Sequence, residues 1–289
     1  MINLQNDELS VKIAALGAEL QQLQLRHTLT NYLWSGNPQF WGKFSPILFP
    51  IVGALKQNTY YYRNKVYQLS RHGFARDRVF DVLETSPQQV VFQLKDDEQS
   101  RLCYPFAFEL KVKYELLGPS LKCTYEVNNP SATDVLWFSL GAHPAFAVPL
   151  AEQGQYQDYY LQFENDTNLQ TRLIQDNLLS KNTRAIVLDQ GKLRLNHALF
   201  YQDALVFDKL NSKKIQLKNS LNNKGLDFEF AGFPYFGIWA AIDANFVCLE
   251  PWSGVADDLQ HNQQLEEKEG MVQLLPGASY LAKWKVTCY

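Results

Sequence analysis

The most regular feature of the chain is an alternation of polar and apolar residues that repeats every second position. Residues 111–116 alternate in this way, and residues 121–127 alternate again after a short Gly-Pro turn. Because successive side chains of a strand point to opposite faces of a sheet, this period indicates half-buried β-strands. Two such segments around a short turn predict a β-hairpin.

The same pattern continues along most of the chain. It predicts further strands at 90–94, 203–207, 214–217, 226–230, 235–240, 246–250 and 280–287. An aromatic content of 13% also favours strands, because flat rings pack well on a pleated surface. The polar residues 219–224 indicate a turn between two of these strands.

Helical signals are few in this sequence. Residues 257–261 predict a short helix with two aspartates in its first turn, and residues 40–44 predict a single helical turn. No internal repeat is visible, which argues against a propeller or a solenoid, and no linker divides the chain. We therefore predict an all-β protein with one antiparallel domain over residues 1–289, in which long loops carry the chemistry.

Composition narrows the range of partners and compartments. A net charge of −3 with scattered Lys and Arg argues against nucleic acid and against an anionic membrane surface. The first residues lack the pattern of a signal peptide, and no apolar run approaches the ~18 residues of a membrane span. The 4 cysteines have no CxxC spacing, so we expect neither structural zinc nor a disulfide framework. These features predict a cytoplasmic protein.

Two histidines carry the strongest hints of chemistry, since motifs for nucleotides, serine hydrolysis and HExxH metal sites are missing. His72 precedes Gly73, a residue that permits unusual backbone angles or the close approach of a ligand. His143 follows an apolar stretch and precedes Pro144, which suits a rigid general acid. The plainer interpretations are a loop histidine with one backbone hydrogen bond and a satisfied core histidine.

A carboxylate and an aromatic residue near the C-terminus complete this set. Glu250 ends the strand predicted at 246–250, where burial without a partner is costly but makes the pKa easy to tune. Trp252 could stack on the apolar face of a sugar. The plainer interpretations are an exposed carboxylate at a strand end and a core tryptophan. Arg71 and Arg76 flank His72, and we interpret Arg71 as a solvated surface charge.

Four segments resemble, in the same order, motifs of the aldose 1-epimerase (galactose mutarotase-like) superfamily, and in particular its LacX-like bacterial branch. They read Phe-Pro-Ile-Val-Gly-Ala-Leu-Lys at 49–56, Arg-His-Gly-Phe-Ala-Arg-Asp at 71–77, Gly-Ala-His-Pro-Ala-Phe at 141–146 and Leu-Glu-Pro-Trp at 249–252. The resemblance spans nearly the whole chain. It implies a β-supersandwich of large antiparallel sheets with few short helices. It also implies cofactor-free interconversion of the α and β anomers of an aldose.

The resemblance also assigns roles to particular residues. Glu250 is similar to the general base and His143 to the general acid of ring opening and reclosure, whereas His72 is similar to a residue that orients and polarises the sugar. Asp203, which precedes an apolar segment, is similar to an aspartate that binds sugar hydroxyls. Because His143 must be protonated while Glu250 is ionised, this assignment predicts a bell-shaped pH profile.

One departure from the family pattern concerns an arginine that contacts the sugar in galactose mutarotases. Residues 53–56 read Gly-Ala-Leu-Lys and contain no arginine. Lys56 is a candidate replacement, although lysine is a point donor and not a planar fork. Arg76 is a second candidate, for contact with a sugar or a phosphate. The substrate is therefore a free aldose or a phosphorylated one, as for the neighbouring hexose-6-phosphate mutarotases.

Three other functions use some of the same residues. A non-catalytic carbohydrate-binding protein does not need an acid–base pair. A glycoside hydrolase usually needs two carboxylates around the scissile bond, and only Glu250 has a persuasive context. A mononuclear metal site could use His72, His143 and Glu250, although epimerisation requires no metal and no nicotinamide. A monomer and a homodimer are both compatible with the sequence.

Overall fold

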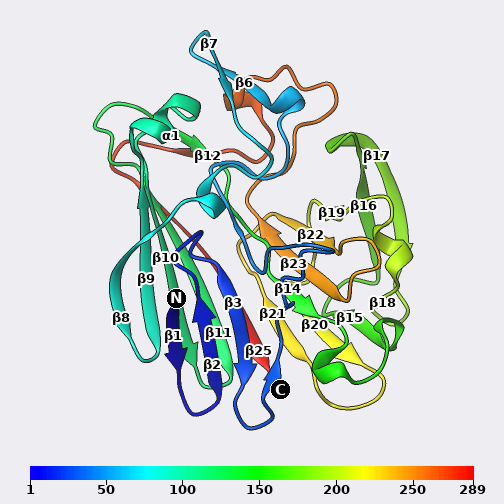
Figure 1. The fold of residues 1–289 in the computed structure, drawn as a ribbon. Coiled ribbons are helices and arrows are strands. Elements are labelled where there is room, and N and C mark those ends of the chain that lie inside the picture. The colour runs from blue at the N-terminus through cyan, green and yellow to red at the C-terminus, as the bar shows by residue number, and fades with distance from the viewer.

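Two large antiparallel sheets contain most of the strands (Figure 1) in the computed structural model, which describes residues 1–289. The nine-stranded sheet has the spatial order β18-β15-β20-β21-β25-β11-β10-β9-β8. Its strands are β8 (Asp81–Ser86), β9 (Gln89–Lys95), β10 (Glu109–Leu117), β11 (Ser120–Asn128), β15 (Tyr159–Phe163), β18 (Lys192–Arg194), β20 (Lys214–Asn219), β21 (Leu226–Glu229) and β25 (Ser279–Cys288).

The eight-stranded sheet has the order β17-β16-β19-β22-β23-β13-β5, and β14 also pairs with β23. Its strands are β5 (Ile47–Leu48), β13 (Gly141–Ala142), β14 (Ala145–Ala147), β16 (Asn168–Gln175), β17 (Leu178–Val187), β19 (Leu205–Phe207), β22 (Tyr235–Trp239) and β23 (Phe246–Trp252). β23 is therefore enclosed on both sides by other strands. This central position matters for the candidate site, because β23 carries Glu250.

Three smaller sheets and a few short helices complete the fold. The small sheets contain β1 (Ile2–Gln5), β2 (Leu9–Ile13), β3 (Leu20–Leu25) and β4 (Thr30–Asn31); β6 (Thr59–Tyr62) and β7 (Lys65–Gln68); and β12 (Leu136–Phe138) and β24 (Val272–Leu274). The helices are α1 (Glu98–Cys103) and the 3-10 helices η1 (Lys56–Asn58), η2 (Ala75–Asp77), η3 (Leu150–Glu152), η4 (Tyr156–Asp158), η5 (His197–Phe200) and η6 (Leu265–Glu267).

The strand pattern read from the sequence agrees with these elements. Alternate residues of β10 and β11 are buried, and the residues between them are partly exposed. The two strands form the predicted hairpin, with Leu117 opposite Ser120, so that Gly118 and Pro119 make the turn. Gly118 has a φ of 57°, a left-handed conformation that glycine adopts without strain. The predicted all-β architecture of large antiparallel sheets is confirmed.

The two helical predictions are wrong in their details. Residues 257–261 form no helix, because the backbone of Asp258 makes a β-bridge with Leu179 and the side chain of Asp257 binds other groups. The single turn expected at 40–44 lies slightly earlier, where the N–H of Trp41 donates to the carbonyl of Asn37. The one α-helix, α1, was not predicted, although Asp97 caps its start.

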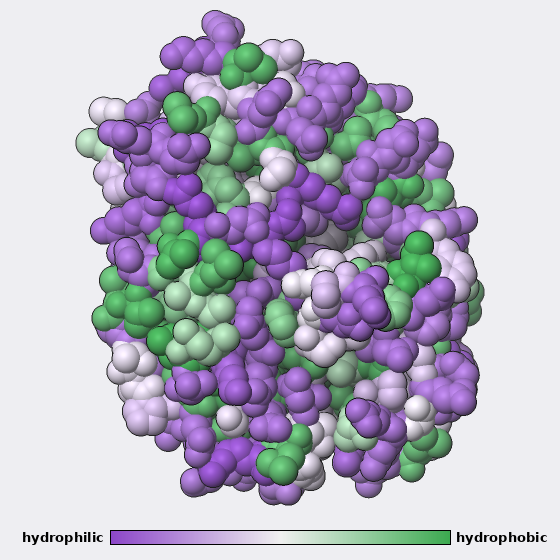
Figure 2. All heavy atoms as spheres, viewed as in Figure 1, coloured by the Kyte–Doolittle hydropathy of each residue, from purple (hydrophilic) through white to green (hydrophobic).

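The surface and the core follow from the same alternation. On the face drawn in Figure 2, hydrophilic residues lie over all parts of the surface and hydrophobic residues form smaller groups. The main core is one continuous cluster of 74 buried apolar residues. No helix has the length and apolar character needed to cross a membrane.

Candidate active site

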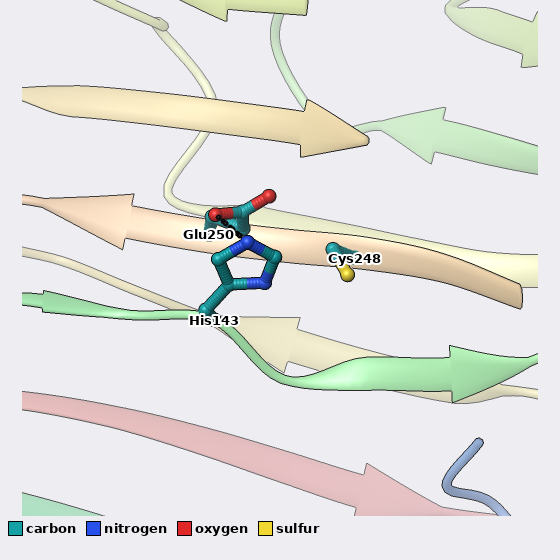
Figure 3. Close-up of side chains that lie close together, drawn as sticks. All are labelled: His143, Cys248 and Glu250. Carbon is teal, nitrogen blue, oxygen red and sulfur yellow. Dashed lines mark ion pairs between the residues drawn. The ribbon is translucent and has the colours of Figure 1, made fainter. Parts of the chain in front are cut away.

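Glu250 lies on a strand that is buried along its whole length. Every residue of β23 is buried, and Glu250 itself is only 1% exposed. Cys248 and Glu250 are two positions apart, so their side chains project from the same face of the strand, as Figure 3 shows. Gly237 of β22 is paired with Glu250 and has no side chain to cover it.

His143 reaches Glu250 from the short connection between β13 and β14. Both of these strands pair with β23, with Gly141 opposite Trp252 and Ala145 opposite Cys248. The residues between them therefore run alongside the middle of β23 (Figure 3). His143 Nε2 lies 3.1 Å from Glu250 Oε2, and both residues line the cavity described below.

Burial controls the ionisation of this pair. It raises the pKa of Glu250 well above the usual value, an effect that the positive charge of Arg71 opposes. Burial, together with the charge of Arg71, lowers the pKa of His143 to about 3. Both groups are thus driven toward their neutral forms. In the free protein, burial thus favours a proton on Glu250 over a proton on His143.

His72 is held by its own strained backbone and by Gly53. It has a φ of 68°, which is unusual for a residue with a side chain. Its N–H donates to the carbonyl of Gly53 at 2.9 Å, and the N–H of Gly53 donates back to His72 Nδ1 at 3.1 Å. Gly73 follows with a φ of 69°, and a Cβ at that position would lie 2.3 Å from the carbonyl oxygen of Phe49. Gly73 therefore allows the predicted close approach, but the group that comes close is the backbone of Phe49.

The two histidines and the glutamate line one cavity of about 860 Å³. Three other residues predicted from the sequence, Asp203, Arg76 and Trp252, also line it. Of the predicted site residues, only Lys56 does not. The structure thus gathers side chains from four distant parts of the sequence around one space.

Lys56 is directed away from this cavity. Its Nζ lies 3.4 Å from the carbonyl oxygen of His261, and its backbone N–H donates to Asp257 Oδ2 at 2.9 Å. These contacts tie Lys56 to the segment 257–261. They give no support to the expectation that Lys56 replaces the sugar-contacting arginine of the family pattern.

Arg71 is exposed, as expected, but it also lies on the cavity wall, which the sequence analysis did not predict. Although its side chain is 44% exposed, its Nε lies 3.1 Å from His72 Nε2 and its Nη1 donates to Asn177 Oδ1 at 3.0 Å. Its Nη2 is 3.9 Å from Asp203 Oδ1. The only hint in the sequence was its position beside His72.

Arg76 and Asp203 each use part of their hydrogen-bonding capacity on neighbouring residues. Arg76 Nη2 donates to the carbonyl oxygen of Arg71 at 2.8 Å, and its Nε lies 3.6 Å from Asp77 Oδ2. Asp203 Oδ1 accepts from the N–H of Ala204 at 2.7 Å. The other carboxylate oxygen of Asp203 has no such bond, so a ligand hydroxyl can donate to it.

The aromatic surface of the cavity differs from the one predicted. Trp252 is only 6% exposed, because its ring packs against the backbone of Gly141 and Gly237. Trp41 and Trp239, which the sequence did not single out, also line the cavity and are less buried. Trp41 stacks on His143 with 5.0 Å between the ring centroids. These two rings offer a ligand more accessible aromatic surface than Trp252 does.

One group of side chains has the types and the proximity of metal ligands. The candidate ligand atoms of His143, Cys248 and Glu250 lie within 4.8 Å of one another (Figure 3). His72, which the sequence placed in a hypothetical metal site, is not part of this group. Burial raises the pKa of the Cys248 thiol well above its usual value, which opposes the thiolate form that binds metals. These residues suit proton transfer better than metal binding.

Comparison with known proteins gives consistent matches over almost the whole chain. A family model described as aldose 1-epimerase matches residues 1–273. The plasmid and chromosomal forms of protein LacX from Lactococcus lactis subsp. lactis are each 33% identical over 284 residues, which is 95% of this chain and 95% of each relative.

Solved structures give the same result for the fold. A galactose mutarotase related enzyme from Lactobacillus acidophilus has a TM-score of 0.95 and 33% identity, over 100% of this chain and 97% of that one. A galactose mutarotase-like protein from Lactobacillus casei ATCC 334 has a TM-score of 0.91 and 30% identity, over 100% of both chains. The predicted superfamily resemblance and the galactose mutarotase-like fold are confirmed.

Proposed function

Because the chain belongs to the aldose 1-epimerase family, we propose that it interconverts the α and β anomers of an aldose by acid–base opening and reclosure of the sugar ring. The observation that carries this proposal is the buried contact of 3.1 Å between His143 Nε2 and Glu250 Oε2 in a cavity large enough for a sugar. An acid and a base within reach of the same sugar are what the reaction requires, and binding alone does not need them.

The proposed reaction moves two protons and breaks one bond. Glu250 takes the proton of the anomeric hydroxyl while His143 gives a proton to the ring oxygen, so that the C1–O5 bond breaks and an aldehyde forms. Rotation about C1–C2 then presents the other face of the carbonyl. When O5 attacks C1 again, His143 recovers its proton and Glu250 returns the other one. The pair therefore starts and ends each turnover with one proton.

The free protein favours this proton on Glu250, whereas the proposed reaction needs it on His143. The short contact between Oε2 and Nε2 is a direct path for the transfer. Hydroxyl groups of a bound sugar would donate to the carboxylate and favour its charged form, and the nearby charge of Arg71 acts in the same direction. Substrate binding would thus set the protonation that catalysis uses.

The test is polarimetry on freshly dissolved α-glucose, α-galactose and glucose 6-phosphate, which also compares free and phosphorylated sugars. We expect the wild type to accelerate mutarotation of at least one of them. Glu250→Gln and His143→Asn should each lower kcat by at least ~100-fold, since each removes a proton-transfer group. Glu84→Gln, at an exposed position of β8, is the matched control and should behave like the wild type.

Two results would change the assignment. A near-normal kcat in Glu250→Gln removes Glu250 as the base, and a raised KM with unchanged kcat in His143→Asn reduces His143 to a binding role. If the wild type accelerates no aldose, the non-catalytic carbohydrate-binding function takes precedence. Calorimetric titration with the same sugars then tests that function.

A further inference from the structure

His143 and Glu250 carry buried polar atoms that the protein itself leaves unsatisfied. His143 Nε2 faces Glu250 Oε2 at 3.1 Å, whereas His143 Nδ1 is buried and has no hydrogen-bond partner. Glu250 Oε2 also lacks a well-aligned hydrogen bond. Because a buried polar atom without a partner costs free energy, two such atoms in one place indicate that a ligand can bind there.

Cys248 adds a third atom of a type that binds metal ions. Its thiol, the imidazole of His143 and the carboxylate of Glu250 offer ligand atoms within 4.8 Å of one another, and Figure 3 shows the three side chains gathered beside the middle of β23. All three residues are more than nine-tenths buried. Sulfur, nitrogen and oxygen ligands of these types bind Zn²⁺ at about 2.0–2.3 Å, so one ion can contact all three after small side-chain movements.

The charge and the chemical character of these ligands select the kind of cation. Bound as a thiolate and a carboxylate, Cys248 and Glu250 supply two negative charges, which a divalent cation balances in a buried site. A thiolate and an imidazole favour Zn²⁺ or Cd²⁺ over Mg²⁺ and Ca²⁺, which prefer oxygen ligands. The raised pKa of the Cys248 thiol means that the cation must displace a proton from the sulfur, and metal binding to cysteine does so.

We propose that His143, Cys248 and Glu250 form a site for one thiophilic divalent cation such as Zn²⁺, and that an ion bound there blocks the epimerase reaction. His143 and Glu250 line the cavity, so a cation can reach them from it, and Cys248 is fully buried next to them. A carboxylate that binds a cation is not free to take the proton of an anomeric hydroxyl, so cation binding and proton transfer exclude each other. The binding site stands by itself, whereas the block of turnover rests on the proposed function.

The first experiment is calorimetric titration of the metal-free protein with ZnCl2, for the wild type, Cys248→Ser and Glu250→Gln. Each variant removes one of the three ligands. We expect each to weaken Zn²⁺ binding by at least ~100-fold, since the outer partners of a ligand alone are worth about 10- to 100-fold. MgCl2 should not bind. Cys103→Ser removes the one thiol that is not fully buried, and as the control it should bind Zn²⁺ like the wild type.

Two further readouts separate the site from the proposed function. Cd²⁺ bound to a thiolate absorbs ultraviolet light through charge transfer from the sulfur. Cd²⁺ should therefore add this band to the spectrum of the wild type and of Cys103→Ser, but not to that of Cys248→Ser. In polarimetry, saturating Zn²⁺ should abolish the acceleration by the wild type, and EDTA should restore it.

Several results would overturn the proposal. Cys248→Ser that binds Zn²⁺ as tightly as the wild type would remove Cys248 as a ligand. A wild-type spectrum to which Cd²⁺ adds no thiolate band would do the same, and it decides the question even if Cys248→Ser does not fold. An unchanged rate at full Zn²⁺ occupancy would show that the ion lies away from the acid–base pair. A wild type that accelerates no aldose contradicts only the proposed function, because calorimetry and the Cd²⁺ spectrum still test the site.

Discussion

Glu250 illustrates how a single residue can give up stability for chemistry. Its folded-state pKa is raised above the value of 4.5 expected when it is exposed, so the folded state binds this proton more tightly than the unfolded state does. The resulting stabilisation is fully present below about pH 4.5. It is lost as the pH rises through the folded-state pKa.

We therefore expect Glu250→Gln to be more stable than the wild type at neutral pH. Glutamine mimics the neutral acid and does not ionise. The free energy of unfolding of the variant should therefore exceed that of the wild type by an amount that grows above pH 4.5 by at most ~1.4 kcal/mol per pH unit and vanishes near pH 4. Urea unfolding at pH 4, 6 and 8 measures this difference. The folded-state pKa of His143 is lowered, so its contribution to stability is lost as the pH falls. Both proteins contain His143, so this contribution cancels to first order in their difference.

Glu84→Gln again serves as the control, because its side chain is exposed on β8 and lies outside the cavity. A wild type that is more stable than Glu250→Gln at pH 8 would mean that the pair is a stabilising ion pair in the free protein. That outcome would contradict the preference for a proton on Glu250.

The sequence identified the cavity residues that stand beside distinctive neighbours in the chain. It failed for long side chains whose direction depends on contacts in the folded protein. His143 and Glu250 each precede a proline beside an apolar strand, and this sequence context singled them out, although β23 continues past Glu250 to Trp252. The sequence offered Lys56 and Arg76 as cationic contacts for the sugar, of which only Arg76 lines the cavity, and it passed over Arg71, which also lines it. The direction of a long side chain depends on partners such as Asn177, which lies more than a hundred residues away.

At the scale of elements, β22 and β23 depend on a close contact at Gly237. A Cβ at this position would lie 2.4 Å from two ring atoms of Trp252, a residue that follows Glu250 on the neighbouring strand. We expect Gly237→Ala to displace the ring and to destabilise the protein by about 1–3 kcal/mol, with a loss of activity. Urea unfolding and polarimetry measure the two effects.

Gly42→Ala is the matched control for this substitution. No atom lies closer than 3.8 Å to a Cβ at Gly42, and its φ is not in the left-handed region. We expect its stability and activity to stay close to those of the wild type. Equal stability of Gly237→Ala and the wild type would show that the Trp252 ring can move aside without cost.

The strands were easier to predict than the helices for a physical reason. An alternating strand repeats its signal many times, as in β10 and β11, whereas a helix of one or two turns has too few residues for a period to appear. Asp257 looked like the first residue of a helix, but its carboxylate is bound by Lys268 Nζ at 3.1 Å, a partner that no local pattern reveals. Tertiary contacts overrode the local preference there.

At the scale of the whole molecule, we propose that residues 1–289 fold as one unit, since both large sheets draw strands from distant parts of the chain. β25 lies between β21 and β11 in the nine-stranded sheet, and Trp284 and Val286 on it are fully buried. A chain that ends at Ala278 should therefore not fold. Far-UV circular dichroism and thermal unfolding test this expectation, and a cooperative transition in the shortened chain would contradict it.

The position of β25 also has a consequence for biosynthesis. β25 occupies the interior of the largest sheet (Figure 1), between strands that are all translated before it. Until β25 has been made, β8 to β11 on one side and β15, β18, β20 and β21 on the other cannot be joined. The nascent chain thus carries two open sheet edges until β25 emerges, and during that time pairing with another chain competes with correct closure.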